Sequence, residues 1–220
     1  MLAAAAVCPQ TPLIVTRMPG LRAVCDAAVE GVLAARPDVL VVVGGATATE
    51  AYAGGAAGSL RPWGLDAGAG TGEPVLPLSL TVGRCLLDGL PGGRVPDACQ
   101  AVAFDAAPAE CRALGEKLAA RGERVGLLVL ADGSACLTPK APGKYDEAAG
   151  PFDDRVAEAL GAADPAVLDA LDPAEADRLW ATGRAALQVL AGAAGGAALR
   201  GRLLARTAPY GVGYFTALWD

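Results

Sequence analysis

Apolar runs and amphipathic stretches alternate along this chain. Residues 3–8 form a short apolar run that ends at Pro9, and residues 21–36 then carry apolar side chains at helical spacing. After Pro37, the β-branched run of residues 39–43 stops at Gly44 and Gly45. A run without polar alternation is typical of a strand covered on both faces, so this order of strand, helix and buried strand predicts a parallel sheet.

The same alternation continues to the end of the chain. The pattern predicts a long Gly-rich loop over 46–77, helices over 78–90 and 108–121, strands over 101–104 and 125–131, a mainly helical stretch from 153, and a closing strand pair over 199–206 and 212–219. Asp164-Pro165 and Asp172-Pro173 each predict a helix start, with aspartate as the cap and proline in the first turn. We therefore expect one α/β domain over residues 1–220, with a mostly parallel central sheet flanked by helices on both faces.

An ordinary dinucleotide-binding domain is the alternative fold. It would carry a G-x-G-x-x-G fingerprint after the first strand, but residues 9–12 read Pro-Gln-Thr-Pro. The glycines that let a backbone approach a pyrophosphate are therefore missing at this position.

Composition and charge exclude several classes of partner. Hydrophobic residues make up 53% of the 220 and charged residues only 19%, so the chain can bury a sizeable core. A net charge of -6 argues against a nucleic-acid partner, which requires a clustered basic surface. No apolar run approaches the roughly 20 residues of a membrane span. The apolar start, residues 1–7, lacks the basic region of a signal peptide.

Six scattered cysteines and the lack of histidine bound the chemistry further. No C-x-x-C pair occurs, so we expect reduced thiols and a cytoplasmic protein. The chain contains no histidine at all, which removes the commonest ligand for zinc, iron and copper and excludes any catalytic triad with a histidine base.

The strongest candidates for chemistry follow the buried strand 125–131, because ligands in open α/β sheets bind beyond the carboxyl ends of the strands. Asp132 is a candidate acid or base, or else a cap for the turn that follows it. Ser134 could hold a polar group of a ligand or stabilise the same turn. Cys136 is a candidate nucleophile, although without an imidazole neighbour it also fits a small buried side chain.

Five stretches together resemble the class III extradiol dioxygenase B-subunit superfamily, whose LigB-like fold is shared by Memo-type proteins. They are residues 7–13 (VCPQTPL), 41–45 (VVVGG), 130–134 (LADGS), 141–145 (APGKY) with Phe152-Asp153, and 208–215 (APYGVGYF). These stretches span nearly the whole chain in the order that the family keeps. The resemblance implies a LigB-like domain.

In catalytic members, the resemblance implies ferrous iron held by two histidines and a glutamate, with a further histidine as acid and base. This chain departs at each of these positions: Gln10 replaces the first histidine, residues 44–46 offer no ligand for the second, and Ala135 and Cys136 follow Asp-x-Ser where a histidine is usual. The glutamate position falls near Ala181 and Thr182. We therefore expect no metal and no conventional extradiol cleavage.

The remaining interpretation is a metal-free LigB-like protein that keeps a pocket at the strand ends for a small molecule or a peptide. Gln10, Gly44, Gly45 and Tyr210 are its expected ligand-binding residues. The alternative is an enzyme: an oxidoreductase of the superfamily acting on a catechol-like aromatic with aberrant ligands, or a metal-free catalyst using Asp132, Ser134 or Cys136. A homodimer is the commonest oligomer and is our expectation on that basis alone.

Overall fold

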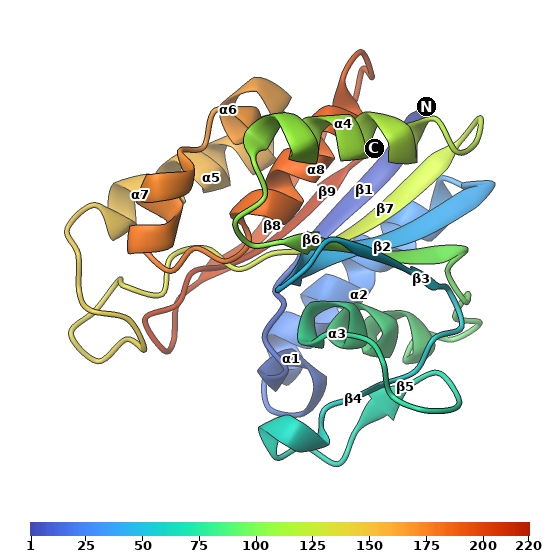
Figure 1. Cartoon of the computed structure of the whole chain (residues 1–220), viewed down its shortest axis with the longest axis horizontal. Helices are drawn as coiled ribbons and strands as arrows, with labels where there is room; N and C mark the ends of the chain where they lie inside the picture. The colour runs from blue at the N-terminus through green and yellow to red at the C-terminus, as the bar shows by residue number, and fades with distance from the viewer.

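Four buried parallel strands form the centre of the molecule in the computed structural model, which describes residues 1–220. They belong to a seven-stranded sheet of order β3-β6-β2-β7-β1-β9-β8 (Figure 1). The strands are β1 (Leu2–Cys8), β2 (Val39–Ala46), β3 (Glu50–Ala53), β6 (Ala98–Ala103), β7 (Val125–Leu130), β8 (Gly201–Thr207) and β9 (Tyr214–Trp219). Strands β6, β2, β7 and β1 run parallel, whereas β3, β9 and β8 pair antiparallel at the two sides.

Strand β7 lies between β1 and β2, although it follows both in the sequence. Val7 pairs with Val129 on one side of β7, and Val43 pairs with Val129 on the other. The carboxyl ends of the three strands are therefore neighbours. This arrangement brings the segments after Cys8 and Leu130 to the same edge of the sheet.

Helices cover the two faces of the sheet (Figure 1). One face carries α1 (Leu13–Thr16), α2 (Pro19–Ala34), α3 (Leu78–Asp88) and the short pair β4 (Gly58–Ser59) and β5 (Gly68–Ala69); the other carries α4 (Pro108–Ala119), α5 (Ala149–Ala162), α6 (Pro165–Asp169), α7 (Pro173–Arg178) and α8 (Arg184–Ala194). The expected α/β domain, with a parallel sheet centre and helices on both faces, is confirmed.

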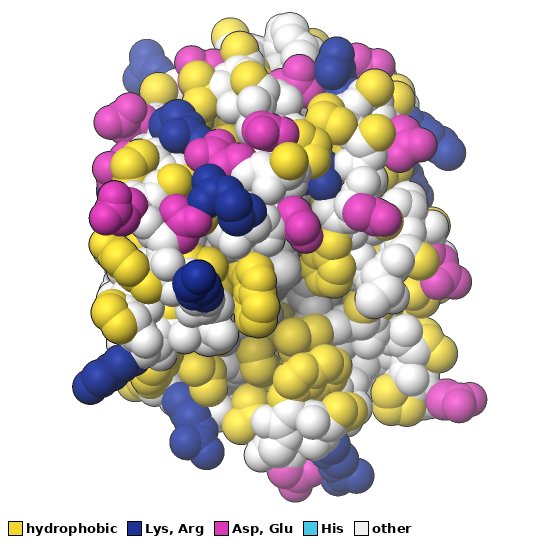
Figure 2. Space-filling model, turned by 60° about the vertical axis from the view of Figure 1, so that its left-hand side comes forward, with side chains coloured by type: hydrophobic (Ala, Val, Ile, Leu, Met, Phe, Trp, Pro, Cys, Tyr) yellow, Lys and Arg dark blue, Asp and Glu magenta, His cyan; other side chains and the backbone are white.

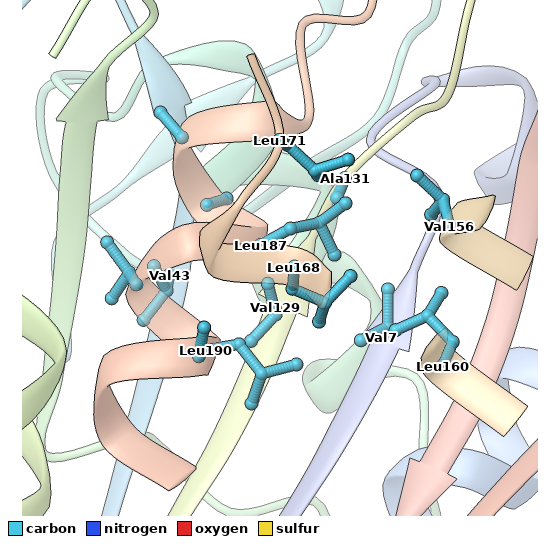
Figure 3. Packing of buried hydrophobic residues seen from close by; sticks show 14 of the residues in the cluster. Val7, Val43, Val129, Ala131, Val156, Leu160, Leu168, Leu171, Leu187 and Leu190 are labelled. Carbon is cyan, nitrogen blue, oxygen red and sulfur yellow. The ribbon is translucent and has the colours of Figure 1, made fainter. Parts of the chain in front are cut away.

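Helix α8 lies directly against the sheet, and all eleven of its residues are buried. Figure 3 shows Leu187 and Leu190 of this helix among valines of β1, β2 and β7. Helix α4 packs on the outer side of α8, and glycines make this possible: a Cβ on Gly115 would overlap the carbonyl oxygen of Val189, and one on Gly192 would overlap that of Arg112. The two helix backbones are therefore in contact.

The aspartate caps predicted from the sequence are confirmed. Asp164 accepts the backbone N–H of Ala166 at 2.9 Å, and Asp172 accepts that of Ala174 at 3.0 Å. The proline that follows each aspartate occupies the first turn, where it has no N–H to leave unpaired. These caps start α6 and α7, the two short helices beside the strand ends.

The expected loop over residues 46–77 is wrong in part. This stretch contains β3, β4, β5 and a 3-10 turn, η1 (Arg61–Trp63). Strand β3 is mostly exposed, and it owes its strand conformation to antiparallel pairing with β6, from Glu50 opposite Ala101 to Ala53 opposite Ala98. Such a strand leaves little hydrophobic pattern, because its neighbour and not its own burial defines it. No helix has the length and apolar character needed to cross a bilayer.

Candidate functional site

A cavity of about 760 Å³ opens at the carboxyl ends of the parallel strands. Segments that follow β1, β6 and β7 line it together with residues of α7 and the start of α8. Figure 2 shows this face of the molecule hollowed near its centre, with hydrophobic side chains inside the hollow and both acidic and basic side chains around the rim above it. The polar, charged and aromatic residues of the lining are Gln10, Thr11, Phe104, Asp105, Asp132, Asp177, Trp180, Thr182, Arg184 and Tyr214.

Gln10 and Asp132 meet at the junction of β1 and β7. The backbone N–H of Gln10 donates to Oδ1 of Asp132 at 2.9 Å. The backbone oxygen of Asp132 in turn accepts the N–H of Gly183 at 3.1 Å. A Cβ on Gly183 would overlap that oxygen, so glycine is required for the start of α8 to approach the strand end. Asp132 thus joins three segments that are distant in sequence.

The Gln10 side chain lies in the cavity wall with an incomplete set of hydrogen bonds. It is 8% exposed, and its Nε2 donates to Oγ1 of Thr182 at 2.5 Å. Its buried Oε1 has no partner. Exchanging the two amide atoms would let Thr182 donate to Oε1 but would leave Nε2 without a partner. In either orientation one polar atom of Gln10 is unsatisfied.

Asp132 carries the most perturbed carboxyl group in the cavity. Burial raises its pKa to about 7, the backbone N–H groups of Gln10 and Thr11 oppose this rise, and the nearby Asp153 carboxylate adds to it. A carboxyl group with a pKa near neutral pH exchanges protons readily under physiological conditions. Asp132 can therefore act as a hydrogen-bond acceptor, a donor or a general acid and base.

Asp153 lies behind this wall and holds the turns together. Its Oδ1 accepts the backbone N–H of Ser134 at 2.8 Å, and burial raises its pKa to about 6. A Cβ on Gly213 would overlap the Asp153 carboxylate. Gly213 therefore allows the turn before β9 to pass against this carboxylate, while Gly211 adopts a φ of +73° that favours glycine.

Trp180 stands at the rim of the cavity in a strained backbone conformation. It is 55% exposed and has a φ of +55°. The backbone N–H of Trp180 donates to the backbone oxygen of Asp177, and that of Ala181 donates to the backbone oxygen of Ala176. This is the hydrogen-bond pattern of a Schellman motif closing α7. Glycine is usual at this position, and a tryptophan there is conformationally costly. The cost is consistent with a role for the exposed indole.

Arg184 is the only basic residue of the cavity lining, and it is 3% exposed. Its guanidinium donates to the backbone oxygens of Phe104 and Ala106 at 2.6 Å and to Oε1 of Gln188 at 2.9 Å. No carboxylate forms an ion pair with it. The N–H groups with partners are all directed at neutral acceptors of the protein itself, so Arg184 ties the end of β6 to α8.

Of the residues predicted for catalysis, only Asp132 lines the cavity. Ser134 is fully buried, where its Oγ donates to the backbone oxygen of Leu179 at 3.2 Å and accepts the N–H of Cys136 at 3.1 Å. Cys136 is 1% exposed, and burial raises the pKa of its thiol. Both therefore stabilise the turn beneath the cavity wall.

Of the residues predicted for ligand binding, only Gln10 lines the cavity. Gly44 and Gly45 lie within β2, where added Cβ atoms would meet Ser79 Oγ at 2.5 Å and the Phe104 ring at 2.5 Å. Tyr210 is exposed outside the cavity, and Tyr214 of the same motif lines it instead. The two glycines thus serve packing of α3 and of Phe104 against the sheet.

Sequence reasoning did not find the residues contributed by α7 and α8. Arg184 left one signal, because it is the only charged residue in the stretch 184–194, which is otherwise apolar except for Gln188. A lone buried arginine in such a helix indicates a dedicated set of acceptors. Trp180 left no comparable signal, since exposed aromatic side chains occur on most surfaces. Asp105 directly follows a predicted strand, and Asp177 is close in sequence to the glutamate position that the resemblance implies near Ala181 and Thr182.

The iron centre implied by the family resemblance does not fit these residues. Non-haem ferrous iron requires two imidazoles and a carboxylate, whereas Gln10 and Thr182 offer only a neutral amide and a hydroxyl. No group of three or more Cys, Asp or Glu side chains is arranged to hold a metal ion. We therefore derive no step through iron.

Comparison with known proteins supports the fold alone. No protein-family model and no curated protein matches the chain. The crystal structure of the uncharacterized protein JW3007 from Escherichia coli K12 is similar over 99% of this chain and 100% of that chain, with a TM-score of 0.58 and 13% sequence identity. At this identity the likeness carries the arrangement of helices and strands and no function.

Proposed function

We propose that this protein is a LigB-like relative of the class III extradiol dioxygenases that binds a small organic molecule without the family's iron. Gln10 and Thr182 support this, because they occupy two positions where the resemblance implies iron ligands. They are 172 residues apart in sequence, yet they hydrogen-bond on the cavity wall at 2.5 Å. An amide and a hydroxyl keep such a position polar but bind iron weakly.

The observation that carries the proposal is the composition of the cavity. Its volume of about 760 Å³ suits a small organic molecule. Gln10, Asp132 and Thr182 supply polar groups on one wall, while Phe104 and Trp180 supply aromatic surface, with 41% and 55% of each exposed. Apolar walls with a few polar groups are typical of ligand sites.

Calorimetry with 4-methylcatechol, a neutral aromatic probe, tests this proposal. The protein is first treated with a chelator and the titration is run without oxygen. We expect 1:1 binding with a dissociation constant between about 10 µM and 1 mM, given the few non-hydrogen atoms of the probe. No heat of binding at millimolar probe would overturn the proposal, and so would binding that requires added ferrous iron.

Phe104→Ala locates the binding in the cavity. Removing this wall should weaken 4-methylcatechol binding by about tenfold, because an aromatic contact and its buried area are lost. Trp63→Ala is the matched control, since Trp63 is 46% exposed and does not line the cavity. Equal affinities of the two variants would contradict the location.

Asp132 favours a second candidate, a metal-free enzyme that uses one carboxyl group as acid and base. Its pKa of about 7 suits proton transfer at neutral pH. Ser134 and Cys136 are enclosed behind the wall, which leaves Asp132 alone for this role. Turnover of any substrate by this route should follow a group of pKa near 7 and be lost in Asp132→Asn; activity unchanged in that variant would exclude it.

We also propose a cytoplasmic location. All six cysteines are buried free thiols, which is consistent with a reducing compartment. Labelled protein found in the oxidising periplasm or outside the cell would contradict this.

A further inference from the structure

Acidic side chains outnumber basic ones in the lining of the cavity. Asp105, Asp132 and Asp177 contribute carboxyl groups, and none of them takes part in an ion pair. Arg184 is the only basic side chain. A cavity with aromatic walls concentrates the field of such groups, so it attracts a ligand of opposite charge.

Arg184 does not offer an anion a place to bind. Both of its terminal nitrogens already donate to protein oxygens, at 2.6 Å to Phe104 and Ala106 and at 2.9 Å to Gln188. Its remaining Nε is buried and has no partner, but Arg184 as a whole is only 3% exposed. A carboxylate or phosphate on a ligand would therefore face three aspartates and one arginine that is almost wholly enclosed.

Gln10 supplies an independent indication of the ligand. It is more than nine-tenths buried, it lines the cavity, and its Oε1 has no hydrogen-bond donor. The hydroxyl oxygen of Thr182 cannot supply one while the Gln10 Nε2 donates to it. In this orientation of the amide, a ligand that completes the wall brings an N–H or O–H group.

The aromatic walls suit the same kind of ligand. Phe104 and Trp180 are both more than 40% exposed at the cavity. The faces of such rings attract cations, and tryptophan does so most strongly. Trp180 has a positive φ, which glycine would adopt without strain. The presence of an indole there indicates that the ring contacts a ligand.

We propose that the cavity binds a protonated amine carried on an aromatic or similarly small apolar body. This inference rests on the proposed function and names its ligand class. The ammonium group lies in the field of the three aspartates that line the cavity and donates to Gln10, while the apolar body contacts Phe104 and Trp180. Recognition thus combines charge, hydrogen-bond donation and aromatic contact.

Three probes that share a phenol ring and differ in charge test the inference by calorimetry. Tyramine is cationic, 4-ethylphenol is neutral, and 3-(4-hydroxyphenyl)propionate is anionic. We expect tyramine to bind at least about tenfold more tightly than 4-ethylphenol, and the anion to bind more weakly than both. Binding of the neutral or anionic probe as tight as that of tyramine would overturn the inference and leave the proposed function standing. No binding of any probe would overturn both.

Rim carboxylates provide the matched variants. Asp105→Asn and Asp177→Asn are expected to fold normally, because both side chains are exposed. Each should lower tyramine affinity by about three- to tenfold and leave 4-ethylphenol affinity unchanged. Glu116→Gln makes the same charge change on the exposed side of α4, away from the cavity, and should change neither. An equally large loss of tyramine affinity in Glu116→Gln would assign the effect to the net charge of the protein and overturn the proposed amine site.

Discussion

Two aspartates at opposite ends of β7 make similar hydrogen bonds and have opposite pKa shifts. At the start of the strand, Asp38 accepts the backbone N–H groups of Glu123 at 2.9 Å and Arg124 at 3.0 Å. At the end of the strand, Asp132 accepts the N–H of Gln10 at 2.9 Å. Each carboxylate therefore links segments that are far apart in sequence.

The difference between them lies in solvation. Desolvation is the largest single influence on the pKa of Asp38 and raises it, but the backbone N–H groups of Arg124, Glu123 and Val39 together outweigh it and the pKa is lowered. At Asp132 burial outweighs the N–H groups of Gln10 and Thr11, and the pKa rises to about 7. A hydrogen-bonded carboxylate thus stays ionised at the solvent-exposed edge of the sheet, whereas burial in the cavity lets the same group take up a proton near neutral pH.

The largest expected effect is the pH dependence of Asp132→Asn. Because the folded pKa of about 7 exceeds the ordinary value of 3.8, the native state binds the extra proton. This contribution to stability is full below about pH 4 and is lost as pH rises through 7. The shift corresponds to about 4 kcal/mol, and we expect about half of it because the side chain is partly open to the cavity.

Urea unfolding of wild type and Asp132→Asn at pH 4.5 and pH 8 measures this effect. The free energy of unfolding of the variant, relative to that of wild type, should rise by about 2 kcal/mol from the lower to the higher pH. Asp153 is present in both proteins, and its charge adds to the effect only in wild type, where Asp132 can ionise. The same difference at both pH values would show that Asp132 is ionised throughout and would remove the contrast with Asp38.

Asp38→Asn should act in the opposite direction. The folded pKa of Asp38 is lowered, so its contribution to stability is present above the ordinary pKa and is lost as pH falls through the folded value. The variant should therefore melt a few degrees below wild type at pH 7, with a smaller difference at pH 3. Thermal melts followed by circular dichroism measure this, with Glu116→Gln as an exposed control. A melting temperature equal to wild type at pH 7 would contradict the assignment.

Trp180→Gly and Ala163→Gly separate strain from function. Both residues have positive φ, +55° and +50°, but only Trp180 lines the cavity. Each glycine should stabilise the protein by about 0.5–1 kcal/mol in denaturant unfolding, because the left-handed conformation no longer strains a side chain. Only Trp180→Gly should weaken 4-methylcatechol binding. Equal affinities of the two variants would remove Trp180 from the site.

Much of the fold was predictable because most strands and helices bury a regular face. The runs 39–43 and 125–131 predicted the central strands, and two Asp-Pro pairs predicted the starts of α6 and α7. Strand β3 was missed, since pairing with β6 and not its own pattern defines it. Hydrophobic periodicity reports burial, and it fails where an exposed segment is fixed by its neighbour.

The site was less predictable than the fold. Gln10 and Asp132 follow adjacent strands, so the position of strand carboxyl ends was sufficient to bring them together. Asp105 follows β6 and lies at the same edge, whereas Asp177 and Trp180 reach the cavity only because α7 and the turn after it fold over the strand ends. Ser134 and Cys136 follow the same strand as Asp132, but the turn directs them into the interior. Tertiary packing decides such details, and local sequence does not contain them.

The glycine contacts between α4 and α8 have a consequence for ligand choice. Because the backbones of α4 and α8 touch at Gly115 and Gly192, α8 cannot move outward from the sheet. The cavity wall at Arg184 therefore fixes the depth of the cavity. Another part of the wall belongs to α7, a helix of six residues that adjusts more easily. We expect substitutions over residues 173–178 to change which ligand widths the cavity accepts, whereas the depth of the cavity toward the sheet stays constant.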